Sequence, residues 1–168
     1  MAITVEDGSG LATAEAYDSV LGFKAYADKF GFSYAALSDA QIEQALRKGA
    51  LYMTQKWRKR WAGTRTHPTV QALDFPRYGI TVDQYNFVLS TIVPTDIKNA
   101  NNILAQKAST GADLFADETQ VAKREKIGPI EVEYEQGSRQ RVQYDSVEAM
   151  LQPYLTGSGG FSVQLTKG

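Results

Sequence analysis

The sequence predicts a mainly helical α+β fold: a small helical bundle with a projecting β-hairpin and an extended C-terminal tail. Apolar residues recur every three or four positions over residues 13–31, 38–61 and 94–111, the spacing of amphipathic helices. Residues 130–144 instead alternate around the polar turn 136–138, which is typical of a hairpin. Glycine and serine then dominate residues 156–160, a composition typical of flexible segments.

Length and composition exclude several classes of protein. A chain of 168 residues can bury a sizeable core, and its net charge of −1 argues against a surface that binds nucleic acid everywhere. The absence of cysteine excludes disulfides and thiolate zinc sites. No apolar run approaches the roughly 20 residues of a membrane span, and the N-terminus lacks a signal-peptide pattern. We expect a protein that is cytosolic when it is made.

Three regions are expected along the chain. Residues 1–111 form a helical core domain. Residues 112–155 contain a polar linker, the hairpin and a short C-terminal helix that packs on the core. Residues 156–168 form a flexible tail.

The first helix follows a turn-rich start, VEDGSG, and is expected to begin after an N-cap at Thr13. It should end near Gly31, because glycine readily adopts the left-handed conformation that ends helices. Its expected buried residues are Ala16, Tyr17, Val20, Leu21 and Tyr26.

The second helix carries the clearest local signals. Ser38 is a predicted N-cap, and Gln41 stands three residues later, as in a capping box. The helix is expected to continue to about Trp61. Its core stripe is Ile42, Ala45, Leu46, Gly49, Met53, Trp57 and Trp61.

A dense basic cluster accompanies the end of this helix: Lys56, Arg58, Lys59, Arg60 and Arg65. One interpretation is a solvated helix face whose cations are favoured by the helix dipole. The other is contact with DNA as the lining of a passage, since single-strand binders combine cations with aromatic residues. We favour the first, because Trp57 and Trp61 fall on the core stripe.

The connector QALDFPRYG, residues 71–79, comes next and cannot be helical at Pro76. Leu73 and Phe75 are expected to pack on the tryptophans, and Arg77 to hold nearby carbonyls or a carboxylate. The complete expected structural motif is Trp57, Trp61, Leu73, Phe75, Pro76 and Arg77.

Residues 80–82 and 87–93 are expected to form either two short strands or a packed loop. Pro94 suits the first turn of a third helix, which should end at Gly111. That helix has the apolar face Ile97, Ala100, Ile103, Leu104 and Ala108.

Residues 112–125 are expected to be a linker before the hairpin. In the hairpin, apolar Ile130, Val132 and Tyr134 alternate with glutamates, and the opposite arm contains Arg139, Arg141, Val142 and Tyr144. Ser146 should open the last helix, whose apolar side is Met150, Leu151, Tyr154 and Leu155.

The C-terminal tail contains a lone alternating strand. Phe161, Val163 and Leu165 fall on one of its faces, and a strand is stable only when another edge completes its ladder. That edge could belong to its own hairpin or to another chain.

Enzyme motifs are missing from the sequence. There is neither a phosphate-binding glycine loop nor a G-x-S-x-G elbow, and His67 has no titratable partner at motif spacing. We therefore expect a protein without catalytic residues, metal or cofactor.

An ordered series of segments resembles one family of phage proteins. The segments are VEDGSG, TAEAYDSVLGFKAYADKFG, ALRKGALYMTQKW, WAGTR, QALDFPRYG, IVPTDIKNANNILA, KIGPIEVEYE and MLQPYL. The series is similar to tailed-phage head–tail connector, or adaptor, proteins, which are often labelled DnaT-like single-stranded-DNA-binding.

This resemblance implies a structural subunit of the virion neck that assembles as a ring, similar to rings of twelve copies beneath the portal. The implied partners are the portal protein, tail or stopper or terminator proteins, and double-stranded DNA passing through the ring. The protein would reside in the host cytoplasm before assembly. The tail residues Phe161, Val163 and Leu165 would then dock on the portal or on a neighbouring subunit.

A second interpretation remains open: a DnaT-like single-stranded-DNA-binding protein of phage replication. The two differ in salt dependence, because binding that depends on phosphate contacts weakens steeply as salt rises.

Overall fold

A computed structural model describes residues 2–115, 124–127, 130–133 and 144–156. It contains the helices α1 (Val20–Phe30), α2 (Asp39–Trp57), α3 (Thr95–Ser109) and α4 (Asp145–Leu151), followed by the 3-10 turn η1 (Gln152–Tyr154). Its strands form three antiparallel pairs: β1 (Thr64–Arg65) with β2 (Arg77–Tyr78), β3 (Thr81–Val82) with β4 (Asn86–Phe87), and β5 (Arg124–Ile127) with β6 (Ile130–Glu133). The predicted α+β, mainly helical class is confirmed.

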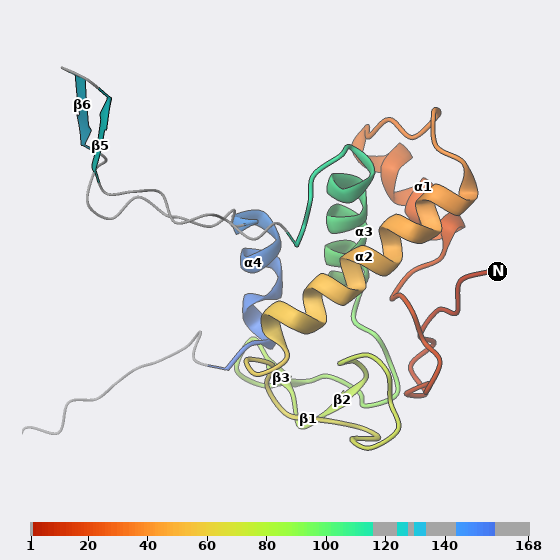
Figure 1. The fold of residues 1–168 in the computed structure, drawn as a ribbon. Coiled ribbons are helices and arrows are strands. Elements are labelled where there is room, and N and C mark those ends of the chain that lie inside the picture. The colour runs from red at the N-terminus through yellow and green to blue at the C-terminus, as the bar shows by residue number, and fades with distance from the viewer. Residues whose placement is uncertain (1, 116–123, 128–129, 134–143, 157–168) are drawn as a thin grey trace, which may run out of the picture.

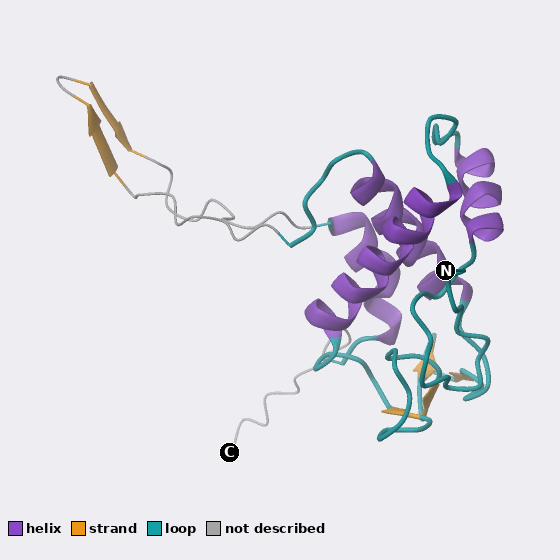
Figure 2. Ribbon diagram, turned by 45° about the vertical axis from the view of Figure 1, so that its right-hand side comes forward, coloured by secondary structure: helices purple, strands orange, loops and turns teal. Residues whose placement is uncertain are grey.

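Helices α2 and α3 pack against each other at the centre of the molecule (Figure 1). Helix α1 lies near the N-terminal end of α2, and α4 packs beside α3. The short strands β1 to β4 gather at the C-terminal end of α2, below the helices in Figure 2. None of the helices in the described residues has the length and hydrophobicity needed to cross a membrane.

Helix α2 begins as the sequence predicts. The Ser38 hydroxyl accepts the N–H of Gln41 at 3.3 Å, and the Gln41 side chain accepts the N–H of Ser38 at 2.8 Å. Every predicted stripe residue from Ile42 to Trp57 is buried. The predicted end at Trp61 is wrong, because the chain turns after Trp57 and Ala62 donates its N–H to the Tyr154 carbonyl at 2.9 Å. Trp61 is nevertheless buried.

Helix α1 begins later than predicted. Its N-cap is Ser19 rather than Thr13, and Leu21 is exposed while Phe23 and Ala27 face the core. Ala16 and Tyr17 are buried ahead of the helix, and the side chain of Asn101 accepts the Tyr17 N–H at 2.9 Å. That long-range contact takes the place of a helical hydrogen bond. The predicted end is confirmed, since Gly31 adopts a left-handed φ of 73°.

The segment after the connector forms the two short strands β3 and β4, the first of the two alternatives left open by the sequence. The β1–β2 pair is not anticipated by the sequence pattern. Helix α3 follows Pro94, as expected, and buries Ile97, Ala100 and Leu104. It also buries Asn101 and Asn102, two polar residues that periodicity assigns no role.

The predicted hairpin has a different partner strand in the structure. Residues 130–133 are a strand, but they pair with Arg124–Ile127, at the end of the region interpreted as a linker. The predicted opposite arm, residues 139–143, lies outside the described residues, and Tyr144 precedes α4 instead of ending a strand. The sequence pattern does not predict β5, because the polar residues Arg124, Glu125 and Lys126 are typical of a solvated linker. Tail residues Phe161, Val163 and Leu165 also lie outside the described part of the chain.

Candidate functional site

The connector is fastened to the end of α2 by a set of buried contacts. The Arg77 guanidinium donates to the carbonyls of Ala62 at 2.7 Å, Gly63 at 2.6 Å and Asp74 at 3.2 Å. Phe75 is completely buried and meets the Trp61 ring edge-to-face, with centroids 5.0 Å apart. The Phe75–Pro76 peptide bond is cis. These contacts fix the position of the segment that joins α2 to β1.

Asp74 is a buried carboxylate beneath this segment. The Trp61 indole donates to its Oδ2 at 3.1 Å, and Arg58 Nε lies 3.7 Å from its Oδ1. The Tyr17 hydroxyl accepts the backbone N–H of Asp74 at 3.0 Å. Burial raises the pKa of the Asp74 carboxyl above its usual 3.8, and the charge of Arg58 partly offsets this effect.

Four of the five predicted cations have partners within the protein. Arg58 faces Asp74, and Arg60 forms an ion pair with Glu148 of α4 at 2.7 Å. Arg65 donates to the carbonyls of Pro68 and Gln71, and Lys56 donates to the Tyr52 hydroxyl at 3.2 Å. Lys59 is exposed and has no hydrogen-bond or ion-pair partner among the residues that the structure describes. It is therefore the cation of this cluster with the greatest freedom to bind a ligand.

The two tryptophans considered for DNA contact, Trp57 and Trp61, do not reach the surface. Trp57 is completely buried and Trp61 is only 4% exposed, so neither ring can stack on an external base. Sequence periodicity assigned both to the core, and the structure places them there. Aromatic rings on which bases could stack must therefore come from other residues.

Three other aromatic side chains are strongly exposed at the same end of the molecule. Tyr78 of β2, Tyr85 of the β3–β4 turn and Phe87 of β4 are 69%, 82% and 80% exposed. Thr64 pairs with Tyr78 and Thr81 pairs with Phe87, so short ladders hold both strand residues. The sequence pattern does not single out these residues, because aromatic residues in a strand pattern usually pack in the core. The signal that could have revealed them is the polar turn 83–86 that interrupts their apolar neighbours.

We call this end of the molecule the strand-end surface and define it by its exposed aromatic residues, the cations of the adjoining turn and Arg65 of β1. The turn leads directly from α2 into β1, beside β2 (Figure 1). The members of the strand-end surface are Arg58, Lys59, Arg60, Arg65, Tyr78, Tyr85 and Phe87.

The N-terminal loop also rests against the protein body through a buried carboxylate. Glu6 is 1% exposed and accepts the backbone N–H groups of Gly8 at 3.0 Å, Gly10 at 2.8 Å and Leu11 at 2.9 Å. A side chain at Gly8, whose φ is 103°, would collide with the Thr91 carbonyl. The VEDGSG segment thus has a structural explanation, in which glutamate closes the loop and glycine permits close packing.

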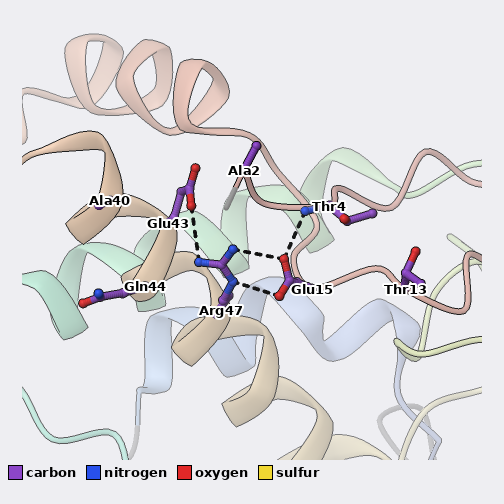
Figure 3. Close-up of a pocket in the computed structure, with 8 residues that line it drawn as sticks. All are labelled: Ala2, Thr4, Thr13, Glu15, Ala40, Glu43, Gln44 and Arg47. Carbon is purple, nitrogen blue, oxygen red and sulfur yellow. Dashed lines mark hydrogen bonds and ion pairs between the residues drawn. The ribbon is translucent and has the colours of Figure 1, made fainter.

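A cavity of about 520 Å³ lies between the N-terminal segment and the start of α2 (Figure 3). Within it, the Arg47 guanidinium lies between two carboxylates, with Nε 3.0 Å from Glu15 and Nη1 3.4 Å from Glu43. The hydrogen bond from Arg47 also lowers the pKa of the Glu15 carboxyl. Because the two acids outweigh the one cation, this cavity is unsuited to bind a phosphate.

No group of three or more histidine, cysteine or acidic residues that could hold a metal ion occurs in the described part of the chain.

Comparison with known proteins identifies one family. The family described as "Putative DnaT-like ssDNA binding protein" matches residues 1–168. No curated protein and no solved structure matches the chain significantly. The match accords with the second interpretation of the sequence, and the family description says nothing of connectors or rings.

Proposed function

We propose, from the premise that this chain belongs to the DnaT-like ssDNA-binding family, that it binds single-stranded DNA at the strand-end surface. The observation that supports this site most directly is the exposure of Tyr78, Tyr85 and Phe87 on and between short strands that gather at the C-terminal end of α2, where the basic turn begins (Figure 1). Proteins that bind single strands combine these two features, cations that follow the phosphates and aromatic rings on which bases stack.

The aromatic residues supply contacts that do not depend on base identity. Stacking of a base on an aromatic ring contributes about 1–3 kcal/mol per base in single-strand binders. Exposed rings of this kind are unfavourable in water, and contiguous apolar surface on a soluble protein commonly marks a binding site. Tyr85 and Phe87 carry the largest exposed fractions of the three.

The cations of the turn have unequal roles in this proposal. Lys59 contacts the phosphates, because it is exposed and unpaired within the described residues. Arg58 and Arg60 are about half exposed, and their internal ion pairs position the turn. Arg65 holds the loop that follows β1 through its bonds to backbone carbonyls. Each phosphate that these residues neutralise adds about 0.7 to the slope of log affinity against log salt, so binding should weaken as salt rises.

The test is the affinity of the full chain for a labelled oligothymidylate, measured by fluorescence anisotropy at low salt. The double variant Tyr85→Ala and Phe87→Ala should bind at least about 10-fold more weakly, since each lost stacking contact removes about 1–3 kcal/mol. Phe30→Ala is the matched control, because Phe30 is an exposed aromatic on α1, 52% accessible. Equal affinities of the double variant and the wild type would exclude this surface as the site.

A second candidate function is the head–tail adaptor of a phage neck, in which ring assembly and portal binding replace strand binding. One observation favours it: among the described elements, β5 and β6 contact only each other. A two-stranded ribbon has two unpaired edges, and unpaired edges are templates for another chain. Double-stranded DNA would then pass the basic turn without stacking on the aromatic residues.

The two functions separate in one experiment. An adaptor should form rings, alone or on portal particles, and show no preference for single strands over duplex. A strand binder should prefer the single strand and release it as salt approaches about 200 mM. Ring formation without strand preference would favour the adaptor over our first proposal.

A further inference from the structure

We propose that the bound strand continues from the strand-end surface along the outer face of α2. This inference rests on the proposed function and adds to it a path and a length. The path is the α2 stripe, which we define as Gln41, Gln44, Lys48, Leu51 and Gln55.

The α2 stripe is a continuous exposed line. All five residues are exposed, and their spacing alternates between three and four, which places them on one side of a helix of 3.6 residues per turn. Arg58, the C-cap of α2, keeps helical backbone angles, with φ −49° and ψ −38°, so the stripe leads into the basic turn that begins there. The stripe therefore ends at the strand-end surface.

The stripe contains no carboxylate. The acidic residues of α2 are Asp39 and Glu43, and both are held by cations: Lys24 lies 2.6 Å from Asp39, and Arg47 lies 3.4 Å from Glu43. Glu43 is also off the exposed line and only 18% accessible at its side chain. A phosphate on the stripe would therefore meet no unpaired carboxylate of α2, although Gln44 borders the cavity that contains Glu15 and Glu43. The whole chain contains 19 acidic residues and 18 basic ones.

The residues of the stripe suit a nucleic-acid backbone. Lys48 is exposed and has no hydrogen-bond or ion-pair partner in the described residues, so its ammonium group is available to a phosphate. The three glutamines offer uncharged N–H₂ donors, whereas the side-chain carbonyl of Gln41 already accepts the N–H of Ser38. Leu51 is 50% exposed and offers an apolar contact to a sugar or base.

The geometry also sets the length of the strand. From Gln41 to Trp57, the last residue of α2, the helix rises about 24 Å at 1.5 Å per residue. A stacked strand places one phosphate every 3.4 Å or so, which corresponds to at most about seven nucleotides. This value lies within the range of about 4–16 nucleotides covered by other single-strand domains.

The experiment compares Lys48→Ala with Lys29→Ala in the full chain, using oligothymidylates of about four and about twelve nucleotides. Lys29 is a matched control because it is an exposed lysine on α1, away from the stripe. Lys48→Ala should weaken binding of the longer strand about 3-fold or more and leave the shorter strand unaffected. The slope of log affinity against log salt should fall by about 0.7, the contribution of one single-strand phosphate contact. Lys29→Ala should change neither quantity.

Two negative outcomes differ in meaning. If Lys48→Ala binds the longer strand as Lys29→Ala does, while the variant lacking Tyr85 and Phe87 still loses affinity, the path along α2 is wrong and the proposed function stands. If the wild-type chain binds neither strand, both the function and the path are wrong.

Discussion

The indole nitrogen of Trp61 donates a hydrogen bond to the buried carboxylate of Asp74 at 3.1 Å, and this contact joins the end of α2 to the connector. Arg77 completes the junction by donating to the carbonyls of Ala62 and Gly63. The WAGTR and DFPR segments are therefore one structural unit, although the residues in contact are 13 to 15 positions apart in the chain. The exposed basic turn is positioned by this buried unit.

Phe75→Ala should destabilise the protein strongly. The side chain is completely buried and contacts the rings of Trp61 and Tyr154 at centroid distances of 5.0 and 6.0 Å. Truncation of a buried phenylalanine costs about 3–5 kcal/mol, because it removes apolar contacts and leaves a cavity. Chemical denaturation measures this loss. Phe87→Ala is the matched control and should stay within about 0.5 kcal/mol of the wild type, since its side chain is exposed. Unchanged stability of Phe75→Ala would contradict the packing described here.

Asp74 should make stability depend on pH. Because burial raises the pKa of this carboxyl above 3.8, the folded state binds its proton more tightly than the unfolded state does. Stability should therefore fall as pH rises from about 3.8 through the raised folded-state pKa, and stay constant above it. The asparagine side chain of Asp74→Asn cannot ionise, so this variant should lack that pH dependence of stability. Urea denaturation at several pH values should show the wild type losing stability relative to Asp74→Asn across that window. A constant difference between the two would show that the carboxyl is not perturbed.

Lys59→Ala should weaken binding of single-stranded DNA without changing the melting temperature. Its side chain is exposed and unpaired within the described residues, so the folded state loses no internal contact. The salt slope should fall by about 0.7, as expected for one phosphate contact. Arg60→Ala serves as a comparison, because it also removes the ion pair with Glu148 and should lower stability by up to about 1 kcal/mol. Normal affinity and salt slope of Lys59→Ala would remove this lysine from the binding surface.

A chain ending at Thr156 should fold with the stability of the full chain. Thr156 donates its N–H to the Arg60 carbonyl at 2.6 Å, and Leu155 forms a bridge with Trp61, so these contacts remain. If the adaptor function is correct, this shortened chain should fail to attach to portal rings, because Phe161, Val163 and Leu165 are missing. Cosedimentation with portal rings measures attachment. Full attachment of the shortened chain would show that these three residues are not needed for docking.

The sequence by itself determined the elements that depend on local chemistry. The Ser38–Gln41 capping box and the stripe from Ile42 to Trp57 predict α2, because hydrogen bonds within one turn and side chains on one helix face depend only on near neighbours. The same holds for Gly31 at the end of α1 and for the strand at residues 130–133.

Tertiary structure alone decided the start of α1, the partner of residues 130–133, and which cations and aromatic side chains are exposed. Asn101 binds the N–H of Tyr17 from 84 positions away, which holds that residue outside the helix. Asp74 and Glu148 decide which arginines of the basic turn are paired, and the core decides that Trp57 and Trp61 are buried while Tyr85 and Phe87 are exposed. Periodicity cannot supply these answers, because hydrogen bonding, charge pairing and burial depend on distances in space between residues far apart in the chain.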